Sequence, residues 1–350
     1  MKDEIILAIE SSCDETAIAV LKNNKELLAN VVSTQIPVHQ KYGGVMPEIA
    51  SRLHVENIGF VLQEALDESK IKLEDIDAIA VTSGPGLIGA LHVGLQCAKT
   101  LSLFLNKPLI PVHHLAGHIY ANEYVTPLKF PCLAIVVSGG NTELVLLKEH
   151  LSFEIIGDTQ DDAIGEAFDK VARVVGLPYP GGVAIDREAK KGHNVYKLPI
   201  PHTEGKYDYS FSGLKTAVIN LVTKERNNNR EVNVQDLACS FQTTAINYLL
   251  DKALPCIDEF NIKQVVLAGG VSANSYLRQE ITNRCKEKYK DVEVVIPPLW
   301  CTTDNAAMIA KVGSYLYHKG VQADLTLSCD PSWKIENYLE FGAKKWKIFI

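Results

Sequence analysis

Two histidines and a distant aspartate are the residues of this chain best suited to hold a metal ion. His114 and His118 are four residues apart, so on a helix their imidazoles lie one turn apart on the same face. Asp304 opens the last long predicted helix, and its carboxylate would complete a set of ligands that suits a catalytic Fe²⁺ or Zn²⁺. Each signal has an ordinary alternative, because helix histidines are often simply hydrogen-bonded and an aspartate often caps or neutralises a helix start. His113 falls off the shared face and is the weaker ligand candidate.

Two carboxylates occupy a turn near the N-terminus. Asp14 and Glu15 lie between the apolar runs Ile5–Glu10 and Ala17–Leu21, which predict a hairpin of two strands. Kinases and ATPases of the actin-like type usually carry a glycine-containing phosphate turn at such a place, and two carboxylates would repel a terminal phosphate unless a cation lay between them. Carboxylates are suited instead to accept a proton or to orient an amine. We therefore predict that this turn activates a nucleophile and does not serve phosphoryl transfer.

Three glycine-rich turns in the second half of the chain predict a nucleotide site. They are Ser138–Thr142 between two strands, Pro180–Gly182 ahead of Asp186, and Gly269–Asn274 between a strand and a helix. Glycines allow backbone N–H groups to approach an anion, and a helix start adds a favourable dipole. Asn274 and Asp169 could form hydrogen bonds with ribose hydroxyls. The alternatives are a plain helix cap for Asn274, a helix salt bridge with Arg173 for Asp169, and ordinary hairpin turns for the glycines. The chain lacks the GxxxxGK[ST] pattern, which excludes a P-loop.

Composition places the chain among cytoplasmic globular proteins with two cores. It has 350 residues, of which 47% are hydrophobic, and a net charge of −7. The charge argues against unspecific coating of nucleic acid, although Lys190, Lys191 and Lys197, or Lys344, Lys345 and Lys347, could form a local basic patch or simply a solvated surface. The eight cysteines are scattered without a CxxC pair, which favours reduced thiols. We expect no signal peptide and no membrane span.

The order of predicted elements favours an α/β fold with an internal duplication. A second hairpin, Leu133–Val137 with Glu143–Leu147, repeats the pattern of the first. Strands then alternate with helices. The predicted helices are Pro47–Ser69, Ile88–Leu105, Gly165–Val175, Ala184–Lys191, Leu237–Phe260, Tyr276–Tyr289 and one that starts near Asp304. The polar stretch Glu225–Glu231 is expected to be a surface loop, and two lobes are expected to pack closely around a cleft.

Taken together, these residues resemble the tRNA N6-adenosine threonylcarbamoyltransferases, the TsaD family, once described as O-sialoglycoprotein endopeptidases. The resemblance covers nearly the whole chain in order, and the form of Asp208–Lys215 resembles the bacterial or organellar branch. One departure is the stretch Trp300-Cys301-Thr302-Thr303 ahead of Asp304, where the family usually has a cysteine close before Thr-Asp. That cysteine is not an expected ligand, so the metal assignment is little affected. The matching stretches are Ile9–Thr16, Gly43–His54, Ser83–Leu87, His113–His118, Ser138–Glu143, Gly165–Lys170, Tyr179–Gly182, Ser210–Lys215, Gly269–Asn274 and Asp304–Ala310.

The resemblance implies an actin-like (ASKHA) two-lobed fold built from duplicated ribonuclease-H-like units. Residues 1–127 would form the N-terminal lobe with the acidic turn and the histidine pair. Residues 128–323 would form the C-terminal lobe with the glycine turns and Asp304, and residues 324–350 a tail that packs back on the lobes. The implied reaction moves the threonylcarbamoyl group from threonylcarbamoyl-AMP to the N6 amine of the adenosine 3′ of the anticodon, in tRNAs that read codons starting with A.

The resemblance also implies roles for individual residues and partners. His114, His118 and Asp304 would bind one divalent metal per subunit, with Fe²⁺ favoured and Zn²⁺ the alternative. Asp14 or Glu15 would be catalytic. Implied partners are tRNA, threonylcarbamoyl-AMP, a synthase that makes it, a paralogous TsaB-like subunit and a small TsaE-like P-loop ATPase, but no membrane. The residues expected to line the adenylate site are Val137, Ser138, Gly139, Gly140, Asn141, Asp169, Gly182, Asp186 and Asn274.

Three other functions fit the sequence less well. A zinc peptidase of the HExxH type needs a glutamate directly after its first histidine, but Leu115 follows His114. An actin-like ATPase or kinase is disfavoured by the acidic turn. A non-catalytic scaffold like the paralogous partner would lack the metal ligands, which are all present here.

Overall fold

The computed structural model describes residues 3–338, which divide into two compact units. Of these residues, 3–126 and 303–338 form unit 1, and 127–302 form unit 2. Asp304 and the helix after it therefore lie with unit 1, whereas the sequence analysis grouped them with residues 128–323. The described part of the expected tail also lies with unit 1, and Lys344, Lys345 and Lys347 fall outside the described residues.

The two units contain sheets with the same strand order. In unit 1 the order is β3-β2-β1-β4-β5, and in unit 2 it is β8-β7-β6-β9-β10. In each sheet the first three strands pair antiparallel and the last two join in parallel. This repetition confirms the prediction of an α/β fold with duplicated units. The strands are β1 (Ile5–Glu10), β2 (Glu15–Lys22), β3 (Glu26–Thr34), β4 (Ala78–Gly84), β5 (Leu109–His113), β6 (Cys132–Val137), β7 (Thr142–Leu147), β8 (Glu154–Asp158), β9 (Gln264–Ala268) and β10 (Glu293–Val295).

Most predicted helices are present, with two notable differences. The predicted helix Leu237–Phe260 is wrong, because α8 ends at Ala253 and a separate short helix begins at Cys256, after a proline that lacks the N–H a continuing helix needs. The expected loop from Glu225 begins inside α7. Unit 1 contains α1 (Ile36–His39), α2 (Pro47–Ser69), α3 (Ile88–Leu105), α4 (His114–Tyr120) and α11 (Ala306–His318); unit 2 contains α5 (Ile164–Val174), α6 (Gly181–Ala189), α7 (Ser212–Asn227), α8 (Val234–Ala253), α9 (Cys256–Glu259) and α10 (Ser275–Lys288).

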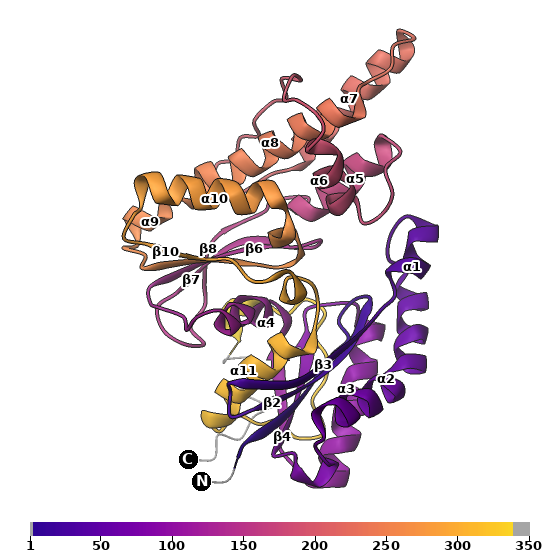
Figure 1. The fold of residues 1–350 in the computed structure, drawn as a ribbon, viewed down its shortest axis with the longest axis vertical. Coiled ribbons are helices and arrows are strands. Elements are labelled where there is room, and N and C mark those ends of the chain that lie inside the picture. The colour runs from indigo at the N-terminus through magenta and orange to yellow at the C-terminus, as the bar shows by residue number, and fades with distance from the viewer. Residues whose placement is uncertain (1–2, 339–350) are drawn as a thin grey trace. The chain divides into compact units, whose positions relative to one another are not determined.

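Different helices cover the two faces of the sheet of unit 1 (Figure 1). Side chains alternate along a strand, and the odd-numbered residues of β1 share an apolar cluster with α2 and α3: Ile5, Leu7 and Ile9. Ile6 faces the other side, where a Cβ added to Gly313 of α11 would lie 3.7 Å from it. By the same alternation Glu10, at the end of β1, points to the face that α11 covers. α4 packs against α11 at this face.

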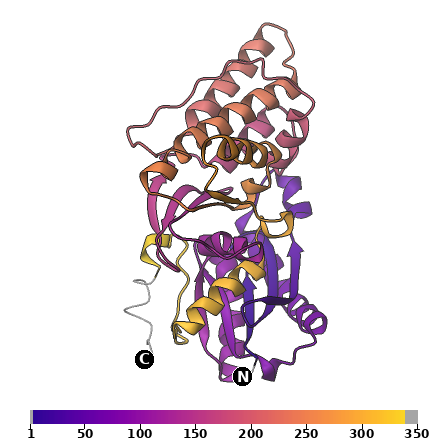
Figure 2. The ribbon, with the colours of Figure 1, turned by 60° about the vertical axis from the view of Figure 1, so that its left-hand side comes forward.

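In unit 2 the helices gather on one face of the sheet, as Figures 1 and 2 show from two sides. Apolar side chains of β6, β7 and β9 form one buried cluster with α5, α7, α8 and α10. Phe168 of α5 and Phe241 of α8 meet edge-on inside it, with ring centroids 5.0 Å apart. This cluster fixes the helices whose first turns carry the glycine-rich segments.

One helix among the described residues, α3, is long and apolar enough to cross a membrane by length and composition alone. The sequence analysis expected no such segment. α3 packs along the sheet of unit 1 and buries Leu91, Leu95 and Ala98 there, which is the environment of a core helix in a globular domain.

The described end of the chain fastens the loop that follows β4. Asp330 N–H donates to the Ser83 carbonyl at 2.9 Å, and Gly86 N–H donates to the Pro331 carbonyl at 3.3 Å. Gly84 has a φ of +154°, and a Cβ added to it would lie 1.9 Å from the Asp330 carbonyl oxygen. Only glycine therefore fits at this position without moving the backbone.

We predict that Gly84→Ala destabilises the protein by about 1–3 kcal/mol, because the new methyl group overlaps a backbone carbonyl. Gly59→Ala is the matched control, since Gly59 lies inside α2 and has open space where the methyl would go. It should leave stability unchanged or raise it by up to about 1 kcal/mol. Chemical denaturation of both variants measures the difference, and equal stabilities would contradict this packing.

Candidate metal centre

Two imidazoles and one carboxylate converge at the junction of α4 and α11. Asp304 Oδ1 lies 3.1 Å from His118 Nε2 and 3.5 Å from His114 Nε2. The ligand atoms of the three residues all lie within 4.8 Å of one another. α4 begins at His114, so the four-residue spacing places the two rings on one face. The structure thus brings together the three residues that the sequence singled out, and nitrogen and carboxylate donors of this kind suit Fe²⁺ or Zn²⁺.

Asp304 does not cap its helix. Asn305 is the N-cap of α11, and its side chain accepts from Met308 N–H. Asn305 therefore has the capping role that was the alternative for Asp304. The Asp304 carboxylate is directed at the two histidines. Burial raises the pKa of Asp304, but the imidazoles of His114 and His118 outweigh burial and lower it to about 2.

A buried carboxylate that the sequence analysis did not select orients His114. Glu10 is fully buried, and its Oε2 lies 3.1 Å from His114 Nδ1. Ser12 Oγ also lies 3.1 Å from this nitrogen. Burial lowers the pKa of His114, but the carboxylates of Asp304 and Glu10 outweigh burial and raise it to about 9. The strand-end position of Glu10 was the available signal, because an acidic residue at the end of an apolar strand needs a partner.

The acidic turn lies close to the same group of residues. Asp14 and Glu15 are 7% and 8% exposed, and Glu15 Oε1 accepts from Thr34 Oγ1 at 3.2 Å. Burial, with the charges of Asp304 and Asp14, raises the pKa of Glu15 well above its ordinary value. A carboxyl group in this setting can hold a proton near neutral pH.

Buried polar side chains from the next segment hold the acidic turn in shape. His54 of α2 lies with Nε2 3.0 Å from the Cys13 carbonyl and Nδ1 2.7 Å from Thr16 Oγ1. A carbonyl only accepts, so Nε2 donates to Cys13, and in the neutral ring Nδ1 accepts from Thr16. Burial lowers the pKa of His54, which favours this neutral form. The Gly43–His54 motif therefore contributes a clamp on the turn that carries Asp14 and Glu15.

His113 has a structural role and is not directed at the metal ligands. Its Nε2 donates to the Trp333 carbonyl at 2.8 Å, and its Nδ1 accepts from Leu115 N–H at 3.2 Å, which makes it the N-cap of α4. The ring packs edge-on against Trp333 with centroids 5.0 Å apart. Burial lowers the pKa of His113 to about 3. The sequence analysis ranked it as the weaker ligand candidate, in agreement with this position.

In unit 2 two segments of the assigned adenylate site, Val137–Asn141 and Gly269–Asn274, lie at the ends of β6 and β9. A Cβ added to Gly269 would lie 2.5 Å from the Val137 carbonyl oxygen, and one added to Gly165 would lie 2.4 Å from that of Ser138. The Ser138–Asn141 turn is closed by Ser138 N–H donating to the Asn141 carbonyl at 2.9 Å. Gly139 and Gly140 at its tip are exposed. Ligands of α/β sheets bind at the carboxyl ends of strands, which is where this turn lies.

The polar residues of this group already have partners inside the protein. Asp169 accepts from Gly181 N–H at 2.6 Å, next to Gly182. Asp186 accepts from Ser275 Oγ at 2.7 Å and pairs with Lys190. Asn274 caps α10 by accepting from Leu277 N–H and donates to Gln242 Oε1 at 2.7 Å. The Asp169 bond joins α5 to the first turn of α6, and the Asp186 bond joins α6 to the first residue of α10. The bond to Gln242 joins the cap of α10 to α8. Asn274 acts as the helix cap that the sequence analysis raised as an alternative.

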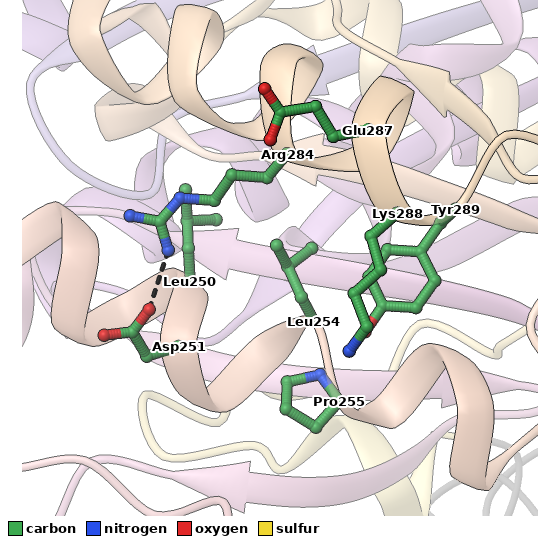
Figure 3. Close-up of a pocket in the computed structure, with 8 residues that line it drawn as sticks. All are labelled: Leu250, Asp251, Leu254, Pro255, Arg284, Glu287, Lys288 and Tyr289. Atoms are coloured by element: carbon green, nitrogen blue, oxygen red, sulfur yellow. Dashed lines mark hydrogen bonds and ion pairs between the residues drawn. The ribbon is translucent and has the colours of Figure 1, made fainter.

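A surface groove of about 270 Å³ lies elsewhere in unit 2 (Figure 3). It is lined by residues of α8 and α10 and the segments that follow them, and Arg284 pairs with Asp251 at its edge with a distance of 2.7 Å. None of the candidate site residues lines it.

A family model described as "TsaD: tRNA N6-adenosine threonylcarbamoyltransferase" matches residues 26–311. The chain belongs to this family. Relatives named tRNA N6-adenosine threonylcarbamoyltransferase from Bacillus anthracis and Staphylococcus aureus (strain Newman) are 54% and 50% identical to it over 336 and 338 residues. Each match covers 96% of this chain and 98% of the relative. The resemblance seen in the sequence motifs is thereby confirmed.

Solved structures of low identity agree with the fold. HypF from T. kodakarensis matches with a TM-score of 0.60 and 16% identity, over 90% of this chain and 48% of that one. The (R)-2-hydroxyglutaryl-CoA dehydratase component A of Acidaminococcus fermentans matches with a TM-score of 0.53 and 15% identity, over 91% and 99%. This chain spans about half the length of HypF. These likenesses support the actin-like fold class and carry no statement about activity.

We predict that the stability of the protein depends on pH through His113. The imidazole has a pKa of 6.5 in an unfolded chain and about 3 in the folded protein, so between these values the unfolded state binds more protons. Stability contributed by the neutral ring is complete above pH 6.5 and falls as the pH is lowered, by at most about 1.4 kcal/mol per pH unit.

Chemical denaturation from pH 4 to pH 8, with a chelator present throughout, measures this dependence. His113→Gln keeps a donor and an acceptor but does not titrate, so its unfolding free energy should fall less steeply below pH 6.5. Identical slopes for the two proteins would contradict the structural role of His113.

Proposed function

We propose that this chain transfers the threonylcarbamoyl group from threonylcarbamoyl-AMP to the N6 amine of the adenosine 3′ of the anticodon, in tRNAs that read codons starting with A, and releases AMP. The observation that carries the proposal is the 54% identity, across 96% of the chain, with a relative named for threonylcarbamoyl transfer to tRNA N6-adenosine. The convergence of His114, His118 and Asp304 near an acidic turn supports it chemically.

The reaction needs little activation of its donor. Threonylcarbamoyl-AMP is a mixed anhydride, so its carbonyl carbon is already electrophilic and AMP is a good leaving group. The protein must position the donor, stabilise charge on the carbonyl oxygen, and remove a proton from a weakly nucleophilic amine. A divalent cation held by His114, His118 and Asp304, with Fe²⁺ favoured and Zn²⁺ the alternative, would supply a Lewis acid for this step.

The acidic turn would manage the proton of the attacking amine. Asp14 or Glu15 orients the N6 amine or takes its proton as the new C–N bond forms and the bond to the AMP phosphate oxygen breaks. Glu15 is supported by its raised pKa and by the Thr34 hydroxyl that fixes one of its oxygens. The His54 contacts with Cys13 and Thr16 would keep both carboxyl groups in place.

Unit 2 would bind the adenylate. The exposed backbone of Gly139 and Gly140 is suited to the phosphate, since glycine lets N–H groups approach an anion closely. Asp169, Asp186 and Asn274 would shape the site by holding α6 and the start of α10 in place. The assigned lining is Val137, Ser138, Gly139, Gly140, Asn141, Asp169, Gly182, Asp186 and Asn274.

The reaction would place the protein in the cytoplasm, with tRNA as the acceptor substrate. Its partner proteins would be a synthase that makes the donor, a paralogous TsaB-like subunit and a small TsaE-like ATPase. We assign no second function, because no feature of the described residues favours an ATPase, a kinase or a peptidase over acyl transfer. Mass spectrometry of tRNA nucleosides after depletion of the protein tests the proposal: loss of threonylcarbamoyladenosine supports it, and an unchanged level would refute it.

His114→Ala is predicted to abolish metal retention and transfer together, because it removes one of three ligands. Elemental analysis of the purified variant and a transfer assay with added threonylcarbamoyl-AMP measure the two effects. His92→Ala on the exposed side of α3 is the control and should retain both. Transfer by a metal-free His114→Ala protein would remove the metal from the mechanism.

Asp14→Ala is predicted to lose transfer by about a hundredfold or more while donor binding is kept, because its carboxyl acts on the amine and not on the adenylate. Calorimetric titration with a non-reactive analogue of the donor, beside the transfer assay, separates the two steps. If the variant instead binds the analogue weakly, Asp14 belongs to the donor site.

A further inference from the structure

Glu10 is a buried carboxylate that no part of the transfer mechanism uses directly. It is fully buried at the end of β1, on the face of the sheet covered by α11. Within residues 3–338 the ion pair recorded for it is with His114, and no lysine or arginine is paired with it. Because an isolated buried charge is very costly, a carboxylate in this place requires a specific cationic partner.

Three donors converge on the Glu10 carboxylate. Ser12 N–H donates to Oε1, and the Thr82 hydroxyl donates to Oε2 at 2.6 Å. His114 Nδ1 lies 3.1 Å from Oε2. Oε1 thus accepts from an N–H and Oε2 from an O–H, so both oxygens are placed as acceptors and the side chain is fixed as a carboxylate.

An ionised carboxylate accepts hydrogen bonds and donates none. His114 Nδ1 must then carry the hydrogen that points to Glu10, which leaves Nε2 as the atom that would bind a metal when the ring is neutral. His118 differs, because its Nδ1 has no hydrogen-bond partner among the described residues. A carboxylate therefore fixes the far nitrogen of His114 but not that of His118.

The charge of Glu10 also acts on the metal site. Glu10 is fully buried and adds a negative charge beside the ligand His114, at 3.1 Å from its Nδ1. A negative charge at this distance favours a cation bound on the other side of the ring. Removing the charge of Glu10 should therefore weaken cation binding.

We propose that Glu10 is a positioning residue of the metal centre: it fixes the Nδ1–H tautomer of His114 and adds a negative charge that strengthens the binding of a divalent cation. This inference rests on the proposed metal site and goes beyond it, since it assigns a residue outside the three ligands. Carboxylates that accept from metal-bound histidines commonly strengthen metal binding by about 10- to 100-fold.

The test is the Zn²⁺ affinity of the purified full chain, measured by competition with a chromophoric chelator at fixed pH. Glu10→Gln keeps the size of the side chain but loses its charge, and it should bind Zn²⁺ about 10- to 100-fold more weakly. Glu123→Gln is the matched control: Glu123 is another carboxylate of unit 1, and it accepts from Tyr315 OH at 2.7 Å. The control should keep the affinity of the unmodified protein.

A proton spectrum of the Zn²⁺-loaded protein adds a readout that a merely structural role would not move. The imidazole N–H shared by His114 and Glu10 should give a downfield, slowly exchanging resonance that is lost in Glu10→Gln and kept in Glu123→Gln. If Glu10→Gln does not fold, Thr82→Val decides, because it removes the hydroxyl that fixes Oε2 and should weaken Zn²⁺ binding in the same direction.

The outcomes separate this inference from the metal site itself. Weaker Zn²⁺ binding by a folded Glu10→Gln protein, with the control unchanged, supports the role of Glu10. Unchanged affinity in Glu10→Gln, or in Thr82→Val where that variant decides, overturns it while the metal site stands. No Zn²⁺ binding by the unmodified chain would overturn both.

Discussion

The site in unit 1 depends on two carboxylates, one fully buried and one partly exposed, that lie on either side of one imidazole. Glu10 and Asp304 come from opposite ends of the chain, and His114 lies between them. Glu10 is fully buried, and a charged group could not stay there without the histidine or a cation beside it. The fold therefore brings the end of β1, the start of α4 and the segment just before α11 to one place, where His114, His118 and Asp304 could hold a divalent ion.

Several contacts outside the ligands maintain that arrangement. His113 caps α4 and anchors it to the Trp333 carbonyl. These two bonds fix the position of the next residue, His114. Gly117 of α4 lies under α11, where a Cβ would meet Ile309 at 2.9 Å, which lets the two helices approach closely. His54 holds the acidic turn from the other face of the sheet. The site is thus positioned by helix contacts and buried hydrogen bonds from four separate parts of the chain.

Regular periodicity and short spacings in the sequence were enough to predict the long helices and one pair of ligands. The long helices α2 and α3 match their predicted bounds, because their apolar stripes are regular, and the spacing of His114 and His118 gave the ligand pair. The sequence did not reveal Glu10 or His54, because their roles depend on partners 104 and 38 residues away in the chain. Strand β3 was missed because its exposed and buried residues do not alternate cleanly. Asp304 was grouped with the second half because the expected lobes followed the order of the chain, whereas the chain returns to unit 1 at Thr303.

The most direct test of this account is a crystal structure of the purified protein with anomalous diffraction measured at the absorption edge of its metal. The account predicts one anomalous peak per chain, about 2.0–2.2 Å from the Nε2 atoms of His114 and His118 and from an oxygen of Asp304. An anomalous peak at other residues would contradict the account. So would the absence of a peak at these three residues in crystals of protein that is active.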